Sequence, residues 1–375
     1  MKSHVGELGL AACLCLAAFS VLACADSFAP QRLFTLRYGS GPGQVGMRLP
    51  AGGEEEGPPA GPTDLAIGPD GSVYIADRVN KRIQRFSATG ELLMEAKAPV
   101  ERKAEHLAAY ERGRGAEIPP RATELDNIQR IAVDSQGCVY VQFGAAIDRL
   151  AKFAGDGQAR WYMHMADAVP LEVRQTYGTF YGGIVVGPED SLCIAVSGRS
   201  VDGIAILDPD GRFLKAVNGY VGTPNGRIAA FTRVAGGALA TAVRMYETDG
   251  VELASFVADP VATDPALFVG IDSFSGTAFD GMDNLYKFAI GVRDQRINLS
   301  SQLTIGCDEV AVRFDHSGRA AAAVRFPGDP FPTGRSSTID YSGNVYRLAF
   351  GAGSVDIIKY VLDTSTSEYT SLRED

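Results

Sequence analysis

Histidine and tryptophan are scarce in this sequence, and positive charge is outnumbered by negative charge. The 375 residues include four His and one Trp, and 35 Lys and Arg stand against 45 Asp and Glu, a formal net charge of −10. Three histidines follow the N-terminal segment (His106, His164 and His316), and they are too dispersed to predict a three-histidine zinc site. The acidic balance argues against a nucleic-acid partner, because phosphate backbones are bound by basic faces.

A membrane-spanning run is also missing at the N-terminus. The apolar stretch from Leu8 to Ala23 is too short and too early for an ordinary transmembrane helix. It ends in Val21-Leu22-Ala23-Cys24, which resembles the lipobox of bacterial lipoproteins. The resemblance implies a signal peptide over residues 1–23, lipid on Cys24, and a place in the cell envelope, on the periplasmic side of the outer membrane or at the cell surface. A plain secretory peptide cleaved after Ala25 remains open.

Six weak copies of one pattern run through the chain, and the clearest extends from Pro62 to Leu93. Apolar runs alternate there with Asp-Gly and Gly turns, an order that is typical of antiparallel hairpins. This copy resembles an NHL repeat, the four-stranded blade unit of a family of β-propellers. The residues that match the repeat are Asp70-Gly71, Tyr74, Asp77, Asn80, Arg82-Ile83, Phe86 and Gly90.

Five further copies follow in order, with their first turns at positions 137, 190, 237, 283 and 343. Six repeats of roughly 45 to 65 residues indicate six propeller blades with insertions. The sixth copy lacks an outer strand, and Gln31 to Gly39 alternates like a half-exposed strand, so we expect it to close the ring.

The predicted fold is therefore all-β: a six-bladed β-propeller of four-stranded antiparallel blades over residues 31–363. An N-terminal strand closes the ring, and short helical insertions lie on one face. A lipidated tether over residues 24–30 precedes the propeller, and a polar, disordered tail over residues 364–375 follows it.

Three cysteines remain after the N-terminal segment: Cys138, Cys193 and Cys307. An odd number in an exported protein raises the question of pairing. Cys138 and Cys193 fall in the second strands of neighbouring blades, which should lie further apart than the roughly 7 Å Cα limit for a disulfide. We expect buried free thiols that act as small apolar residues.

The resemblance also implies a place for chemistry, because six-bladed propellers include lactonases and amidating lyases that hold a metal at the mouth of the central channel, with ligands from the innermost strands. The residues just before each innermost apolar run are Asp64, Arg130, Gly183, Gly276 and Ser336. This set contains one carboxylate, too few for a divalent ion. We therefore expect no metal and no cofactor.

Long insertions gather in the loops that join successive blades and in those that join the middle two strands of a blade. In a propeller these loops share one face, the long-loop face, and the tight turns share the opposite, short-turn face. Function concentrates where insertions gather. Two insertions look helical: residues 100–112, and residues 170–177 with Asp167 as a possible cap.

Aromatic residues accompany these insertions, and two interpretations stay open. They pack the insertions onto the propeller, or they form a ligand or partner surface. The candidate binding residues are Tyr110, Trp161, Tyr162, His164, Tyr177 and Tyr181, with Asp64 and Arg130 at the channel mouth.

Three classes of function remain. The favoured one is a membrane-anchored binding or scaffold module whose long-loop face takes an envelope protein, a glycan or a small ligand. A component of envelope assembly or a ligand sensor is the second. The third is a lactonase- or lyase-like enzyme acting at the central channel, which the inner-strand residues argue against.

Overall fold

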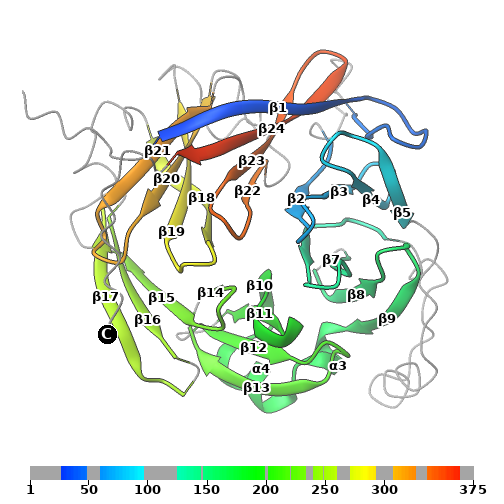
Figure 1. The fold of residues 1–375 in the computed structure, drawn as a ribbon. Helices are drawn as coiled ribbons and strands as arrows, with labels where there is room; N and C mark the ends of the chain where they lie inside the picture. Colours follow the sequence, from blue (N-terminus) through cyan, green and yellow to red (C-terminus); the bar gives the residue numbers. More distant parts are fainter. Residues whose placement is uncertain are drawn as a thin grey trace, which may run out of the picture.

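The computed structural model is a ring of six four-stranded antiparallel sheets around a central channel (Figure 1). The predicted six-bladed, all-β propeller is confirmed. The structure describes residues 27–48, 60–96, 125–144, 147–198, 202–219, 221–233, 240–247, 249–259, 271–292, 307–326 and 336–363.

In blades 1 to 5 the strands follow one another in chain order from one edge of the sheet to the other. Blade 1 contains β2 (Asp64–Ile67), β3 (Val73–Asp77), β4 (Arg82–Phe86) and β5 (Leu92–Ala96). Blade 2 contains β6 (Arg130–Val133), β7 (Val139–Phe143), β8 (Arg149–Phe153) and β9 (Ala159–His164). Blade 3 contains β10 (Phe180–Val186), β11 (Leu192–Ser197), β12 (Gly203–Leu207) and β13 (Phe213–Asn218).

The second half of the ring repeats this arrangement. Blade 4 contains β14 (Val221–Gly222), β15 (Ile228–Arg233), β16 (Thr241–Tyr246) and β17 (Glu252–Ala258). Blade 5 contains β18 (Ile271–Phe279), β19 (Leu285–Val292), β20 (Cys307–Phe314) and β21 (Ala320–Phe326). Blade 6 contains β22 (Ser337–Ile339), β23 (Val345–Phe350), β24 (Ser354–Asp363) and the N-terminal strand β1 (Ser27–Arg37).

The N-terminal strand closes the ring, as predicted. In Figure 1 the blue β1 lies along the outer side of the red β24. Their antiparallel ladder runs from Ser27 opposite Asp363 to Arg37 opposite Ser354, with a register shift between Arg32 and Phe34. The strand begins at Ser27, so it includes residues that the sequence assigned to a tether.

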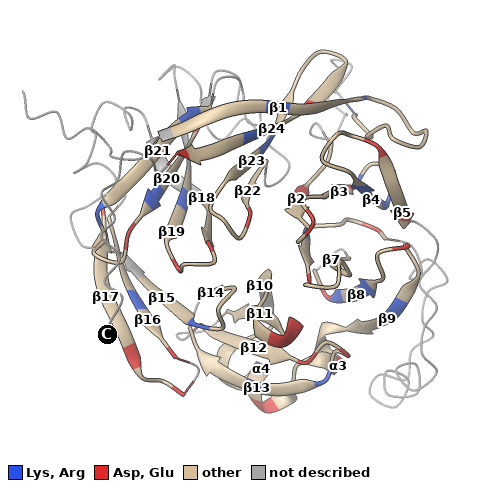
Figure 2. Cartoon of the chain, in the orientation of Figure 1, with Lys and Arg blue, Asp and Glu red and all other residues tan. Residues whose placement is uncertain are grey.

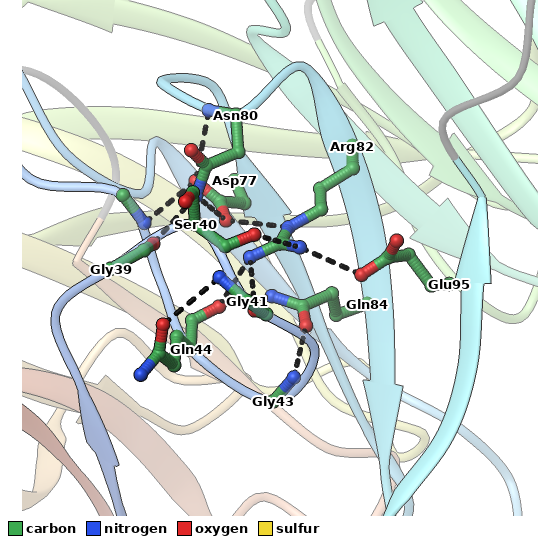
Figure 3. Close-up of polar contacts among 11 residues, drawn as sticks. Gly39, Ser40, Gly41, Gly43, Gln44, Asp77, Asn80, Arg82, Gln84 and Glu95 are labelled. Carbon is green, nitrogen blue, oxygen red and sulfur yellow. Dashed lines mark hydrogen bonds and ion pairs between the residues drawn. The ribbon is translucent and has the colours of Figure 1, made fainter.

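The loop after β1 is fastened to blade 1, and we call residues 39–44 the N-terminal clasp (Figure 3). Its carbonyl oxygens surround Arg82, whose side chain is fully buried. The guanidinium donates hydrogen bonds to the carbonyls of Ser40 (3.1 Å), Gly41 (2.9 Å) and Gln44 (2.7 Å). The arginine's planar fork of five N–H groups suits it to satisfy several acceptors at once.

Carboxylates from blade 1 balance the charge of Arg82. Asp77 lies 2.9 Å from Nε, and Glu95 lies 2.7 Å from Nη1. Gln84 adds two bonds to the clasp: its Nε2 donates to the carbonyl of Gln44, and its Oε1 accepts from the N–H of Gly43. Blade 1 therefore holds the chain that leaves the last blade, and the two ends of the ring are locked together.

Packing between neighbouring blades forms the core, and the period of two along each strand explains it. In β7, Val139, Val141 and Phe143 face blade 1. The alternate residue Tyr140 faces blade 3, together with Leu150 of β8. Because both faces of a blade are covered, these strands are buried along most of their length.

Blade 4 departs from the sequence prediction. The turn expected at Gly237 would place the first hairpin of this blade too late in the chain. The structure puts that hairpin turn at residues 223–227, between β14 and β15, where the N–H of Gly226 bonds to the carbonyl of Thr223. Gly226 has a φ of +80°, which glycine adopts at no steric cost. The blade's inner strand has only two residues, too few for an apolar run to reveal it.

Two short helices join β9 to β10 on the long-loop face: α3 (Met165–Ala168) and α4 (Leu171–Tyr177). The second matches the predicted helix. Its expected cap, Asp167, lies inside α3 instead, and Pro170 precedes the first turn of α4. The other predicted helix, residues 100–112, lies outside the described residues, as do residues 1–26 and 364–375. No helix in the described part of the chain is long and apolar enough to cross a membrane.

Cys138 and Cys193 are free thiols, as the spacing of neighbouring blades predicted. Cys193 is buried, and this burial raises the pKa of its thiol to about 12. Cys138 is partly exposed, which corrects the expectation that it is buried. The side chain of Cys307 lies outside the described residues.

Candidate functional site

A cavity of about 670 Å³ occupies the central channel at the short-turn face. Its lining comes from the ends of the inner strands and from the turns that follow them, and all six blades contribute. In Figure 1 these inner strands and turns surround the centre of the ring. Ligand sites in proteins are concave and few, so this cavity is the candidate functional site.

The wall of the cavity is mainly apolar. It is formed by short aliphatic side chains from the inner strands, among them Ile67, Val133, Val185, Val221 and Ile339. These side chains are half-buried, because they pack against a neighbouring strand on one side and border the channel on the other. A wall of this kind favours a ligand that presents apolar surface.

Polar contacts between neighbouring turns hold the rim of the cavity. Asp190 of blade 3 accepts hydrogen bonds from the backbone N–H (2.7 Å) and the hydroxyl (2.9 Å) of Ser135 in blade 2. Arg227 of blade 4 bonds to the carboxylate of Asp283 in blade 5. Because each bond joins two blades, the rim is fixed in shape.

Tyr341 extends along the rim from blade 6 over blade 5 to blade 4. Its hydroxyl donates to Oδ1 of Asn225 at 3.2 Å, and its carbonyl accepts from the N–H of Gly281 at 2.8 Å. A Cβ atom on Gly281 would lie 2.2 Å from the tyrosine ring, so this close approach requires glycine. The residue is 66% exposed, which leaves it available to a ligand at the mouth.

A polar trio recurs in blades 2, 5 and 6. It combines an Asp in the first turn, a Tyr in the second strand and a Lys or Arg in the third strand. In blade 2, Nζ of Lys152 lies 2.9 Å from Asp134 and 2.8 Å from the hydroxyl of Tyr140. Burial lowers the pKa of Lys152, but the bonds to Tyr140 and Asp134 raise it, and the net direction is upward. Figure 2 shows that acidic residues lie mainly in turns around the ring and basic residues mainly on strands.

In blades 2 and 5 the tyrosine of the trio also links one blade to the next. Tyr140 donates to the carbonyl of Asp190 at 3.1 Å, and Tyr286 donates to the carbonyl of Gly343 at 2.9 Å. In blade 1, Tyr74 makes the same bond to Gly137 at 2.8 Å. Burial raises the pKa of Tyr140 to about 12, so the hydroxyl stays a donor at neutral pH. These bonds close the seams between successive blades at the short-turn face.

The trio of blade 6 is different, because its tyrosine and its lysine border the cavity as well as its aspartate. Tyr346 and Lys359 line it, together with Asp340. The hydroxyl of Tyr346 donates to Oδ2 of its own Asp340 at 3.1 Å. Lys359 Nζ lies 4.0 Å from the same oxygen, so the pair is looser than that of blade 2.

The opposite end of the channel holds the residues that the sequence singled out. Asp64 is buried, and its Oδ2 accepts the N–H of Ile131 at 3.0 Å, which joins the inner strands of blades 1 and 2. Arg130 is half-buried and donates to the carbonyl of Gln129. Gly183 and Gly276 lie within β10 and β18, and Ser336 directly precedes β22.

Three predicted binding residues belong to the outer strand of blade 2. Trp161 is buried, and its indole N–H donates to the carbonyl of Pro209 at 3.1 Å. Tyr162 is buried against Phe143, with the ring centres 5.8 Å apart. His164 ends β9, where Nδ1 lies 3.8 Å from Asp148. The two aromatic rings thus pack between blades, which is the first of the two interpretations that the sequence left open.

The remaining candidates lie near α4. Tyr177 is half-buried at the end of this helix, and its hydroxyl donates to Asn218 at 2.9 Å. It also lines a second cavity, of about 640 Å³, between blades 3 and 4. Tyr181 is buried in β10. Tyr110 and Cys24 lie outside the described residues.

Metal ligands do not gather anywhere in the described part of the chain. No group of three or more His, Cys, Asp and Glu side chains there is placed to hold a metal ion.

The cavity was not predicted from the sequence, because the candidate residues at the channel stand at the start of each inner strand, whereas the cavity lies at the ends. One signal marks the trios: a basic residue stands directly before an aromatic residue near the end of the third strand. The pairs in the three trios are Lys152-Phe153, Arg313-Phe314 and Lys359-Tyr360, and blade 1 carries the same kind of pair in Arg85-Phe86.

Comparison with known families identifies the repeat of blade 1. The NHL-repeat model matches residues 60–86, so the chain carries an NHL repeat in a six-bladed β-propeller, and the resemblance read from these residues is confirmed. No curated protein sequence matches the chain significantly.

Among solved structures, the chain is similar to the hydrazine synthase of Kuenenia stuttgartiensis (13% identity, 80% of this chain and 76% of that chain, TM-score 0.44). It is also similar to a PQQ-bound aldose sugar dehydrogenase from Streptomyces coelicolor (16% identity, 90% and 98%, TM-score 0.43). A gluconolactonase from Xanthomonas campestris shows 12% identity over 80% and 86%, with a TM-score of 0.42.

Proposed function

We propose that this protein is a membrane-anchored, extracytoplasmic binding module whose ligand occupies the short-turn end of the central channel. The observation that carries the proposal is the cavity of about 670 Å³, which all six blades line. Its wall is apolar and its rim is fixed by hydrogen bonds between blades. A preformed site of this kind binds a ligand with little loss of conformational freedom in the protein.

The rim supports binding more than catalysis. A general acid or base needs a free position from which to reach its substrate. The carboxylate of Asp190 already accepts two bonds from Ser135, and that of Asp134 is paired with Lys152 at 2.9 Å. These groups fix the shape of the site.

The anchor in this proposal is Cys24, because its sequence context resembles a lipobox. Strand β1 begins three residues later, at Ser27. Three residues of extended chain span about 10 Å. The outer edge of blade 6 would therefore lie close to the membrane surface. An envelope protein or a glycan on the long-loop face stays a prediction.

A pair of matched substitutions tests the channel. Val185→Phe narrows the cavity from its wall, whereas Val251→Phe adds the same bulk at a site that is 57% exposed and does not line the cavity. Protein purified from its native envelope in mild detergent is examined by native mass spectrometry. We expect a bound small molecule in the wild type and in Val251→Phe, and a loss of most of it in Val185→Phe.

Two outcomes would contradict the proposal. One is a ligand that stays bound in Val185→Phe while the melting temperature is unchanged, because the channel would then not be the site. The other is wild-type protein without any bound molecule that also gains no thermal stability from the small-molecule extract of the envelope. Conversion of the recovered ligand to a product would assign the site to an enzyme.

A further inference from the structure

Two copies of the same polar trio within this chain place their lysines in different environments. In blade 2, Nζ of Lys152 has three close oxygen neighbours: Asp134 at 2.9 Å, the hydroxyl of Tyr140 at 2.8 Å and the carbonyl of Pro209 at 3.3 Å. In blade 6, Nζ of Lys359 makes no hydrogen bond to the described residues and lies 4.0 Å from Asp340 Oδ2. An ammonium group has three N–H donors, so Lys359 has bonding capacity left.

Asp340 does not depend on Lys359. Its Oδ1 accepts the backbone N–H groups of Ser342 (3.0 Å) and Asn344 (2.9 Å). Its Oδ2 accepts the side-chain amide of Asn344 (2.8 Å) and the hydroxyl of Tyr346 (3.1 Å). Four donors thus satisfy the carboxylate, and the lysine can turn to another acceptor without leaving a bare buried charge behind.

The seam between blades 6 and 1 gives access to this lysine. At three other seams a tyrosine hydroxyl bonds to the turn of the next blade. The hydroxyl of Tyr346 turns back to Asp340 instead. The cavity extends to Tyr346 and Lys359 here, and the lysine side chain is 25% exposed. Lys152, by comparison, is 9% exposed and does not line the cavity.

We infer that the channel ligand is a small amphipathic carboxylate, whose anionic end binds Lys359 and whose apolar body lies along the channel wall. The inference deepens the proposed function and rests on it. A charge-assisted hydrogen bond from an ammonium group to a carboxylate is about twice as strong as a neutral one. The half-buried position strengthens it, since less water screens the charge.

The lining limits the charge of the ligand. Lys359 is the one basic residue among the described residues that line the cavity. A single ammonium matches a carboxylate, which carries one negative charge, better than a phosphate monoester with its charge near −2. Two further carboxylates in the lining have partners of their own: Asp134 pairs with Lys152, and Asp190 accepts hydrogen bonds from Ser135.

The apolar part of the ligand would follow the wall from the blade 6 seam toward the opposite blades. Ile67 and Ile339 stand nearest in sequence to the turns that flank this seam, and Val133 and Val185 continue the wall around the ring. Each further methylene that is buried against the wall adds favourable transfer free energy to binding. Affinity should therefore grow with chain length until the cavity of about 670 Å³ is filled.

The test uses octanoate as the probe and 1-octanol as its uncharged counterpart, titrated calorimetrically into the purified full-length protein at pH 7.5. We expect octanoate to bind the wild type at least tenfold more tightly than 1-octanol. Lys359→Met should weaken octanoate about tenfold to hundredfold and leave 1-octanol nearly unchanged. Lys359→Arg keeps the charge and should recover most of the affinity. Lys215→Met removes an exposed lysine that does not line the cavity, so it should have no effect.

The outcomes separate this inference from the proposed function. Equal affinity for octanoate and 1-octanol, both lost in Val185→Phe, would overturn the role of Lys359 and keep the channel as the site. Octyl phosphate binding more than tenfold tighter than octanoate would overturn the choice of a carboxylate. Octanoate binding that survives Val185→Phe, or no saturable octanoate binding at all, would overturn the inference as well. The first of these two results would also contradict the proposed site.

Discussion

Replacing Lys287 by methionine should stabilise the protein near neutral pH. This lysine lies in β19 and is 4% exposed between blades 4 and 5. Its Nζ bonds to the hydroxyl of Thr241 at 2.5 Å and lies 5.6 Å from the centre of the Phe231 ring. Burial lowers the pKa of Lys287 from 10.5 to about 8, because the charged form loses its hydration.

The pKa gives both the size and the sign of the effect. Each pKa unit corresponds to about 1.4 kcal/mol, so holding Lys287 charged in the folded state costs about 3 kcal/mol. Below pH 8 both the folded and the unfolded states carry the proton, and the cost is present in full. Between about pH 8 and 10.5 only the unfolded state keeps the proton, so the free energy of unfolding rises with pH.

Urea denaturation between pH 7 and pH 10 measures this difference. The wild type should gain up to about 3 kcal/mol relative to Lys287→Met over that range. At pH 7 the variant should be the more stable protein, by about 3 kcal/mol less the contribution of the interactions that the lysine loses, of which the bond to Thr241 accounts for roughly 1 kcal/mol. Methionine keeps the length of the aliphatic chain, so no large cavity is created.

Lys152→Met is the matched control. Like Lys287, Lys152 lies on a strand and packs between two blades. Its pKa is raised, however, and its ammonium group pairs with the carboxylate of Asp134. Removing it leaves that carboxylate buried without a cation, so the variant should be less stable than the wild type at pH 7. If the stability difference between wild type and Lys287→Met stays constant from pH 7 to pH 10, the lysine is charged in the folded protein throughout, and the reasoning fails.

Three further predictions concern the ends of the ring. Arg82→Lys should lower the free energy of unfolding by about 3 kcal/mol, because lysine cannot bond to three clasp carbonyls and Asp77 together. Arg85→Lys, which changes a more exposed ion pair, should alter the free energy of unfolding by less than about 1 kcal/mol. Urea denaturation of the two variants measures both effects. Deleting residues 27–37 should lower the melting temperature by several degrees through a loss on the order of a few kcal/mol, and an unchanged calorimetric transition would show that β1 does not complete blade 6 in solution. Cys24→Ala should abolish lipid labelling and detergent partitioning, and a variant that still labels would rule out the lipobox.

The blades were predictable wherever strong local signals mark a hairpin. The turn at Asp70-Gly71 and the apolar runs around it define blade 1 without any tertiary information. Blade 4 was misplaced because Val221–Gly222 is too short to stand out, and Gly237 offered a competing glycine signal. The closing strand could be predicted from its alternating apolar and polar residues. Six four-stranded blades also required one more outer strand than the repeats supplied.

The site was harder to predict, because it depends on how neighbouring blades meet. The sequence places Lys152 and Lys359 in equivalent positions, each before an aromatic residue. Nothing local distinguishes them. Lys152 is covered by the turn of blade 3 through the carbonyl of Pro209, whereas Lys359 borders the channel cavity. The contact between neighbouring blades decides which copy of the trio is accessible from the channel. That contact exists only in the assembled ring.

The pairing of β1 with β24 also fixes an order of events in time. Ser27 pairs with Asp363, which lies 336 residues later in the chain, so the first strand to be synthesised can pair only after the last one has been made. The N-terminal clasp can form its contacts much earlier, because Arg82, its main partner, is synthesised only about forty residues after it. We expect blade 1 to capture the clasp early and hold the end of β1 near Arg37 in place. Pairing of β1 with β24 then proceeds from Arg37 and Ser354 toward Ser27. Until this pairing is complete, the last blade of the nascent protein has an unpaired sheet edge that chaperones can bind.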